Sequence, residues 1–134
     1  MKCGLCGMFY CEGNSFDERE HRRHCRQVER CRKKYGSWLM ADYHERERIK
    51  QESWQVVENA DIDLVERVSA AKMILKAWFS RSVGERGWNL THPDLKKWAG
   101  LFLQNERAVF PAEVFNQLAK IYPAPRSVKR KQAG

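Results

Sequence analysis

Three cysteines and a histidine near the N-terminus have the residue types and the spacing of a metal site. Cys3 and Cys6 are separated by two residues, a spacing that can point both sulfurs at one ion. His21 and Cys25 are four residues apart, which places two side chains on one face of a helix about one turn apart. Four thiolate and imidazole donors complete a tetrahedral zinc ion and leave no position open for a substrate. The pattern therefore predicts one structural Zn²⁺ held by Cys3, Cys6, His21 and Cys25.

The identity of the fourth ligand has an alternative. His24 lies beside Cys25 and three positions after His21, so it could replace Cys25. We favour Cys25 because residues four apart project more nearly in one direction on a helix, and because a thiolate binds zinc well. The alternative to a zinc site is a set of free thiols beside surface histidines. That alternative leaves unexplained why these residue types are concentrated at the N-terminus.

The four residues lie in two longer motifs, Cys3-x2-Cys6-Gly7-Met8-Phe9-Tyr10 and Asp17-Glu18-x2-His21-x3-Cys25. The segment with these motifs resembles the N-terminal zinc finger of the sister-chromatid cohesion acetyltransferases. The likeness covers about the first quarter of the chain, and Cys25 stands where that family has a histidine. It implies a short β-hairpin packed on a helix around zinc, without acetyl transfer, because those enzymes need a further catalytic domain. The remainder of the chain resembles small phage and prophage proteins that carry this finger.

A strand and a helix are expected to position the four metal ligands. The apolar run Met8-Phe9-Tyr10 between glycines is a candidate strand. Ser15, with Glu18 three residues later, forms a capping box, which predicts a helix over residues 16–35 that Gly36 can end. The expected fold of this part of the chain is a small ββα zinc finger with a long basic helix.

One side of this helix is predicted to be a stripe of cations. With about 100° between successive side chains, seven basic residues lie within about 60° of one line, and no acidic residue joins them. Charged helix faces are common and exposed ion pairs contribute little, so an ordinary solvated face is the alternative. A stripe without acids repels itself unless an anion covers it, which favours phosphate binding. The stripe consists of Arg19, Arg22, Arg23, Arg26, Arg30, Lys33 and Lys34, of which all but Lys34 are candidate phosphate contacts.

Residues 37–125 are expected to form an α-helical domain of three or four helices, since apolar residues recur there at helical spacing. The widest apolar stripe predicts a helix from about Ile62 to Ser82, with Gly84 and Gly87 as its stop and turn. Other helices are expected from Asp42 to near Asn59, from the pair Thr91 and Asp94 onward, and from Pro111 to Pro123. The fold class is therefore mainly α: a ββα finger (residues 1–36) and a helical domain.

The net charge of +8 is concentrated at the two ends of the chain. Residues 1–35 have nine basic and five acidic residues, residues 36–125 have twelve of each, and residues 126–134 have four basic residues alone. The last segment has no apolar pattern and is expected to be disordered unless bound. A polyanion would thus meet the finger and this tail. Lys129, Arg130 and Lys131 are predicted to form an auxiliary binding arm.

The sequence has no apolar run of membrane-spanning length and no signal-peptide pattern. Five cysteines, three of them assigned to zinc, indicate a reducing compartment rather than a disulfide framework. Cys31 is expected to be a small buried side chain. We therefore expect a cytoplasmic protein with no membrane partner, inside a bacterial host cell if the chain derives from a phage.

The spacing of nucleophiles, glycines and carboxylates matches no enzyme pattern. His92 precedes a proline at a helix entrance, which favours a capping role over a catalytic one. The resulting hypothesis is a non-enzymatic zinc-finger protein, without a small-molecule substrate, that binds nucleic acid or a protein–nucleic acid assembly. The alternative is a protein-binding adaptor or inhibitor, such as a phage accessory factor that acts on a host protein through exposed aromatic side chains.

Overall fold

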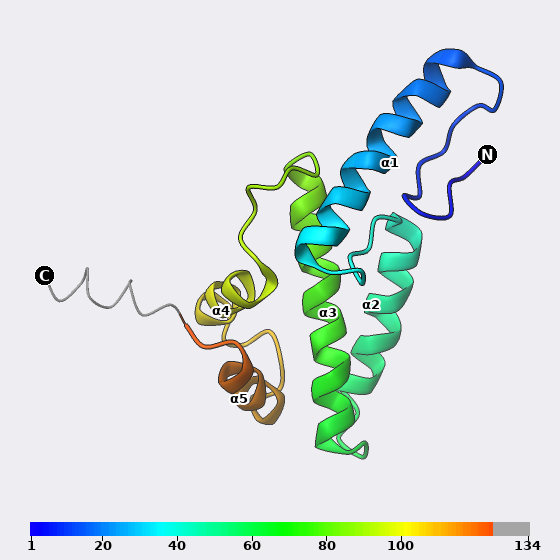
Figure 1. Cartoon of the computed structure of the whole chain (residues 1–134). Helices are drawn as coiled ribbons and strands as arrows, with labels where there is room; N and C mark the ends of the chain where they lie inside the picture. The colour runs from blue at the N-terminus through cyan, green and yellow to red at the C-terminus, as the bar shows by residue number, and fades with distance from the viewer. Residues whose placement is uncertain (125–134) are drawn as a thin grey trace, which may run out of the picture. The chain divides into compact units, whose positions relative to one another are not determined.

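The computed structural model describes residues 1–124, so the predicted arm residues Lys129, Arg130 and Lys131 lie outside the described part of the chain. Within that part the chain forms five helices and no strand, and the prediction of a mainly α protein is confirmed. The helices are α1 (Ser15–Tyr35), α2 (Tyr43–Val57), α3 (Leu64–Glu85), α4 (Leu95–Asn105) and α5 (Ala112–Ile121) (Figure 1).

Contacts between residues divide the chain into two compact units. The first combines Met1–Ile49 with Lys76–His92, and the second combines Lys50–Leu75 with the described residues from Pro93 onward. Both α2 and α3 therefore contribute residues to each unit. The division predicted at residue 36 stays a prediction.

Helix α1 begins one residue earlier than predicted, and its cap is Asn14 rather than Ser15. The Asn14 side-chain oxygen accepts a hydrogen bond from the Asp17 N–H at 3.0 Å, in the extended backbone conformation typical of an N-cap. The Glu18 carboxylate accepts a hydrogen bond from the Gly13 N–H at 3.2 Å. Asn14 caps helices as well as serine does. With Asn14 as the cap, the acidic residues of the first helical turn, Asp17 and Glu18, can bond to the turn that precedes α1. The predicted end of the helix at Gly36 is confirmed.

The core of the first unit is built from α1, the segment after it and the end of α3. The Tyr35 hydroxyl donates a hydrogen bond to the His92 carbonyl at 2.8 Å, and Ser80 Oγ accepts one from the Met40 N–H at 2.9 Å. Cys31 is buried, as predicted. The fully buried side chains here include Val28, Cys31, Leu39, Phe79 and Val83.

His92 does not cap a helix, and that prediction is wrong. Its side chain is buried, with Nε2 2.8 Å from Ser82 Oγ and the ring centroid 4.8 Å from that of Phe79. The N-cap of α4 is Asp94 rather than Thr91, because the Asp94 carboxylate accepts a hydrogen bond from the Lys97 N–H at 2.9 Å. Once Asp94 takes the capping role, the imidazole is available to fill the aromatic part of the core.

Helix α3 runs from Leu64 to Glu85, whereas the prediction was Ile62 to Ser82. It extends past Ser82 because Gly84 does not end it. A Cβ atom at Gly84 would lie 3.1 Å from the Trp88 ring, so the missing side chain makes room for the indole. The turn comes at Gly87, as predicted, where φ is +79°. The glycine inside the helix thus serves packing rather than termination.

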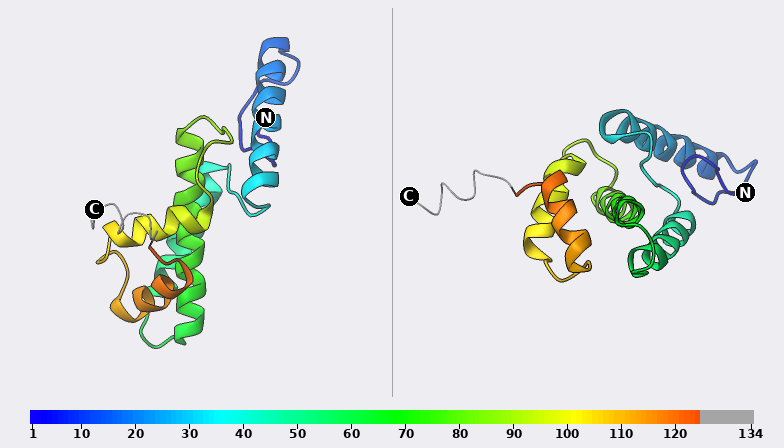
Figure 2. Two further views of the ribbon diagram at one scale, coloured as in Figure 1. Left: turned by 60° about the vertical axis from the view of Figure 1, so that its left-hand side comes forward. Right: turned by 90° about the horizontal axis from the view of Figure 1, so that it is seen from below.

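The second unit places α4 against α5, as both views in Figure 2 show. Arg67 of α3 is buried in this unit, and its polar groups have partners: its Nε donates to the Val57 carbonyl at 2.9 Å, and its guanidinium forms an ion pair with Glu113 of α5 at 3.0 Å. The predicted start of α5 at Pro111 is confirmed. The buried apolar side chains from these two helices and the turn between them are Ala99, Leu103, Phe110, Val114 and Leu118.

We expect the substitution Gly36→Ala to lower the free energy of unfolding by about 1–3 kcal/mol. Gly36 ends α1 with φ at +146°, and a Cβ there would lie 2.1 Å from Trp38 Nε1. Urea unfolding followed by circular dichroism measures the change. The matched control is Gly4→Ala, where an added Cβ meets open space and the expected change is below about 0.5 kcal/mol. Equal stabilities of the two variants would contradict this account of the helix end.

Candidate metal centre

The first ten residues fold back on themselves as a short hairpin. Met1 and Tyr10 exchange main-chain hydrogen bonds of 2.9 and 2.8 Å, and the Cys3 N–H donates to the Met8 carbonyl at 3.0 Å. The Gly7 N–H donates to the Cys3 carbonyl at 2.9 Å and closes the turn that contains both cysteines. This turn directs Cys3 and Cys6 toward one point.

The strand predicted over Met8-Phe9-Tyr10 is not formed. The two arms of the hairpin share a single antiparallel bridge, between Lys2 and Phe9, and the described residues contain no named strand. Each arm is about three residues long, at the lower limit of strand length, so no regular ladder develops. The segment is therefore a hairpin on a helix, without the two strands of the predicted ββα finger.

The predicted metal ligands are brought together by this hairpin and α1. The ligand atoms of all four residues lie within 4.8 Å of one another. Cys3 Sγ lies 3.7 Å from Cys25 Sγ, and Cys25 Sγ lies 3.5 Å from His21 Nε2. Tetrahedral zinc with bonds of about 2.0–2.3 Å places its ligand atoms about 3.4–3.8 Å apart. The sulfurs are too far apart for a disulfide, whose bond length is about 2.05 Å. The geometry fits one metal ion held by Cys3, Cys6, His21 and Cys25.

Side chains around the cluster fix its two halves. The Tyr10 ring stacks on the His21 ring with centroids 4.2 Å apart and planes 6° apart, so a hairpin residue holds a helix ligand in place. Lys2 forms an ion pair with Asp42 at 2.7 Å. A Cβ atom at Gly7 would lie 2.7 Å from Asp42 Cα, so the cysteine turn packs directly against the start of α2. These contacts orient the ligands before an ion binds.

The electrostatics of the thiols favour a bound cation. Burial acts to raise the pKa of Cys3, but hydrogen bonds from the Cys6 main chain and the His21 side chain outweigh it and lower the pKa to about 6. Burial and the neighbouring thiols of Cys6 and Cys3 raise the pKa of Cys25 to about 12. By itself the cluster therefore accommodates one thiolate but not three. A divalent cation removes this conflict, because its charge deprotonates coordinating thiols.

His24, the alternative fourth ligand, is not part of this cluster. Its ring makes an edge-to-face contact with the ring of Trp88, with centroids 6.1 Å apart. Burial, followed by the charge of His21, lowers the pKa of His24. Within the described residues the donor set is therefore three cysteines and one histidine, which is typical of closed structural zinc sites.

The predicted cationic stripe lies on one exposed side of α1. All seven of its residues are exposed, whereas Val28 and Cys31 on another side of the helix are buried. Arg23 forms an ion pair with Glu20, and Lys34 donates a hydrogen bond to the Leu90 carbonyl. The six members that form no ion pair with an acidic side chain of the described residues are Arg19, Arg22, Arg26, Arg30, Lys33 and Lys34.

Sequence reasoning missed the residues that support the site from a distance. Trp88 contacts His24 from beyond the end of α3, and no spacing in the sequence connects the two. Asp42 was predicted only as the start of a helix, and its carboxylate accepts a hydrogen bond from the His44 N–H at 3.0 Å just before α2. Its ion pair with Lys2 depends on the tertiary fold. The Gly7-Met8-x-Tyr10 pattern was the one signal that could have indicated Tyr10.

No protein-family model, no curated protein and no solved structure matches this chain. The resemblance of the N-terminal segment to the cohesion acetyltransferase finger therefore stays a prediction. None of the helices in residues 1–124 combines the length and the apolar composition needed to cross a membrane. The fold and the site define a mainly helical protein with a cluster of three cysteines and one histidine that could hold a metal ion.

We expect purified protein to contain about one zinc ion per chain and to lose it in Cys6→Ser, because three ligands do not close the tetrahedron. Elemental analysis after dialysis measures the content. Cys11→Ser is the matched control, since Cys11 is exposed and lies outside the cluster. His24→Ala should also retain the metal. Loss of zinc in His24→Ala but not in Cys25→Ala would contradict the ligand set.

Proposed function

We propose that this protein is a non-enzymatic zinc-binding protein that attaches to nucleic acid, free or within a protein–nucleic acid assembly, through the cationic stripe of α1. The observation that carries the proposal is the set of exposed cations on one helix face with no acidic partner among the described residues. A nucleic-acid backbone supplies the missing negative charge and releases its condensed counterions. The reducing environment that the free thiols require fits a cytoplasmic setting.

The size of the stripe suits a phosphate backbone. From Arg19 to Lys33 it extends about 21 Å along the helix, at 1.5 Å per residue. B-form DNA carries a charge for about every 1.7 Å of its axis, so several phosphates lie within reach of this length. Arginine and lysine contacts of this kind fix position and orientation without reading sequence.

Zinc would act on this interface indirectly. His21 and Cys25 lie on α1, and Cys3 and Cys6 lie on the hairpin, so an ion at the cluster joins the two segments. Binding energy at such a site becomes folding energy for the segments that supply the ligands. We expect the metal to make the N-terminal half of α1 rigid and so to present Arg19, Arg22 and Arg23 in fixed order.

Reversing two stripe charges should remove nucleic-acid binding. In the double variant Arg22→Glu/Arg26→Glu, we expect affinity for a short DNA duplex to fall by more than about tenfold at low salt. Neutralising the same residues, as Arg22→Gln/Arg26→Gln, should reduce the slope of log K against log salt concentration by about 2. Fluorescence anisotropy over a salt series measures both.

The matched control is Lys96→Glu/Lys97→Glu, which changes the net charge equally on exposed residues of α4. Acids in the first turn of a helix are favourable, so this control should fold well. It should keep most of the affinity. Equal losses in the two charge-reversal variants would mean that net charge, and not the stripe, determines binding.

An apolar groove favours a second candidate function, the binding of a protein. In the second unit a groove of about 370 Å³ lies between α3 and α5. Val65 on its edge is 81 % exposed, and Leu64 and Ile121 beside it are also exposed. A groove of this kind suits the apolar face of an amphipathic helix.

The two candidate functions differ in the variant that abolishes them. If protein binding is the function, Val65→Glu should lose a partner that Arg22→Glu/Arg26→Glu retains, because a charge in the groove opposes apolar contact. Copurification with both variants, followed by mass spectrometry, makes the comparison. A partner retained by Val65→Glu would exclude the groove as its binding site.

A further inference from the structure

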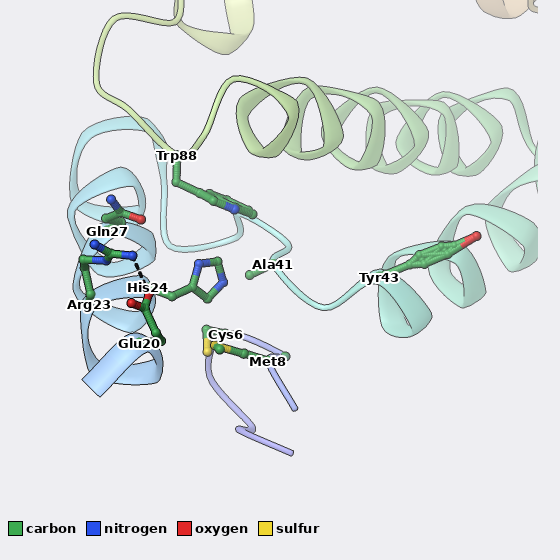
Figure 3. A pocket seen from close by; sticks show the side chains of 10 residues that line it. Cys6, Met8, Glu20, Arg23, His24, Gln27, Ala41, Tyr43 and Trp88 are labelled. Atoms are coloured by element: carbon green, nitrogen blue, oxygen red, sulfur yellow. Dashed lines mark hydrogen bonds and ion pairs between the residues drawn. The ribbon is translucent and has the colours of Figure 1, made fainter. Parts of the chain in front are cut away.

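A cavity of about 440 Å³ lies beside the metal cluster in the first unit. Cavities of about 300–1,000 Å³ are typical of small-molecule sites. Figure 3 shows the Trp88 indole and the hairpin on opposite sides of the His24 ring, with polar side chains of α1 along one wall. The side chains that matter below are those of Glu20, Arg23, Gln27 and Trp88.

The Trp88 indole is held in place by unusual local structure. Trp88 has φ at +56°, the one non-glycine residue of the described chain with positive φ. Its N–H donates to the Val83 carbonyl at 3.1 Å, and its carbonyl accepts a hydrogen bond from the Cys31 thiol at 3.2 Å. Gly84 leaves room for the ring inside a helix, where glycine costs about 1 kcal/mol relative to alanine. Two locally unfavourable residues therefore serve to place one aromatic ring.

We propose that this cavity receives a single unpaired nucleobase, which stacks on the Trp88 indole. The inference rests on the proposed nucleic-acid binding and assigns it to strands that contain an unpaired base. Indole rings are stacking platforms for bases splayed out of a helix, because every base has a π-face. Trp88 is half-buried and positioned before binding, so little conformational freedom is lost when a base arrives.

The polar wall of the cavity suits the edge of a base. Glu20, Arg23 and Gln27 are three or four residues apart and share one face of α1. The Gln27 amide offers a donor and an acceptor, and the Arg23–Glu20 ion pair offers donors beside a carboxylate acceptor. These are the groups with which proteins contact base edges.

The cavity and the cationic stripe meet at Arg23. This residue belongs to the stripe and also lines the cavity, and the two faces adjoin on α1. A strand whose phosphates follow the stripe thus passes the mouth of the cavity. A base that is paired and stacked inside a duplex cannot leave the stack without a cost, whereas an unpaired base enters freely.

The test uses two DNA hairpin duplexes that are identical except at one position. One carries a single unpaired thymine, and the other carries an abasic site there, so charge and backbone flexibility are matched. We expect the wild-type protein to bind the unpaired thymine more tightly by about 5- to 100-fold, the range that base–aromatic stacking provides. Fluorescence anisotropy at fixed salt measures both affinities.

Trp88→Ala should remove this preference, and Trp88→Phe should keep part of it. Gln27→Trp, which fills the cavity from the wall formed by α1 and leaves Trp88 untouched, should also remove it. Zinc content and the thermal melting curve show whether each variant is folded. If Trp88→Ala fails to fold, Gln27→Trp decides the matter.

Equal binding of thymine and abasic duplexes by the wild-type protein would overturn the inference. A preference that survives in folded Trp88→Ala or in Gln27→Trp would overturn it as well. In both cases the proposed function stands if Arg22→Glu/Arg26→Glu weakens binding to both duplexes. Absence of binding to either duplex at low salt would instead refute the proposed function itself.

Discussion

The first unit depends on the charge balance of three thiols crowded around one imidazole. Their ligand atoms lie within 4.8 Å of one another, too close for all three to ionise without a cation. The hairpin that supplies Cys3 and Cys6 has a single bridge and few main-chain hydrogen bonds of its own. An ion bound at this cluster would supply much of the energy that holds the hairpin on α1. The position of every other group on the N-terminal half of α1 follows from that attachment.

Helix α1 contributes side chains to three surfaces: the metal cluster, the cationic stripe and the cavity. It can do so because successive side chains of a helix point in different directions around its axis. One face carries His21 and Cys25 toward the candidate metal cluster, and another carries the exposed cations. Glu20, Arg23 and Gln27 line the cavity on a face between the stripe and the core. A helix is stiff over one or two turns. Contacts made by two faces of α1 therefore also fix the positions of the side chains on its third face. The candidate metal cluster, the cationic stripe and the cavity therefore hold fixed positions relative to one another along α1.

Residue spacing, helix caps and prolines in the sequence predicted those features of the structure that depend on neighbouring residues alone. The metal ligands, the end of α1 at Gly36 and the start of α5 at Pro111 follow from spacing and from cap or proline chemistry, and the structure brings each into the expected place. Two of the wrong predictions, those for Gly84 and His92, concern residues whose roles are set by side-chain packing and not by local sequence. Trp88 occupies the space above Gly84, and Phe79 with Ser82 encloses His92. A residue's type does not reveal which of these tertiary contacts it will make.

The cavity could not be predicted from the sequence because tertiary contacts form it. Two residues at its edge are unfavourable for local structure. A glycine inside α3 and a tryptophan at positive φ both weaken local structure, yet they occur four residues apart and act on the same indole. Strain of about 1–3 kcal/mol at a residue such as Trp88 persists only when the surrounding contacts determine its conformation. Departures from local consistency concentrate at functional sites, and the strain around Trp88 is therefore the feature that motivates the proposed stacking site.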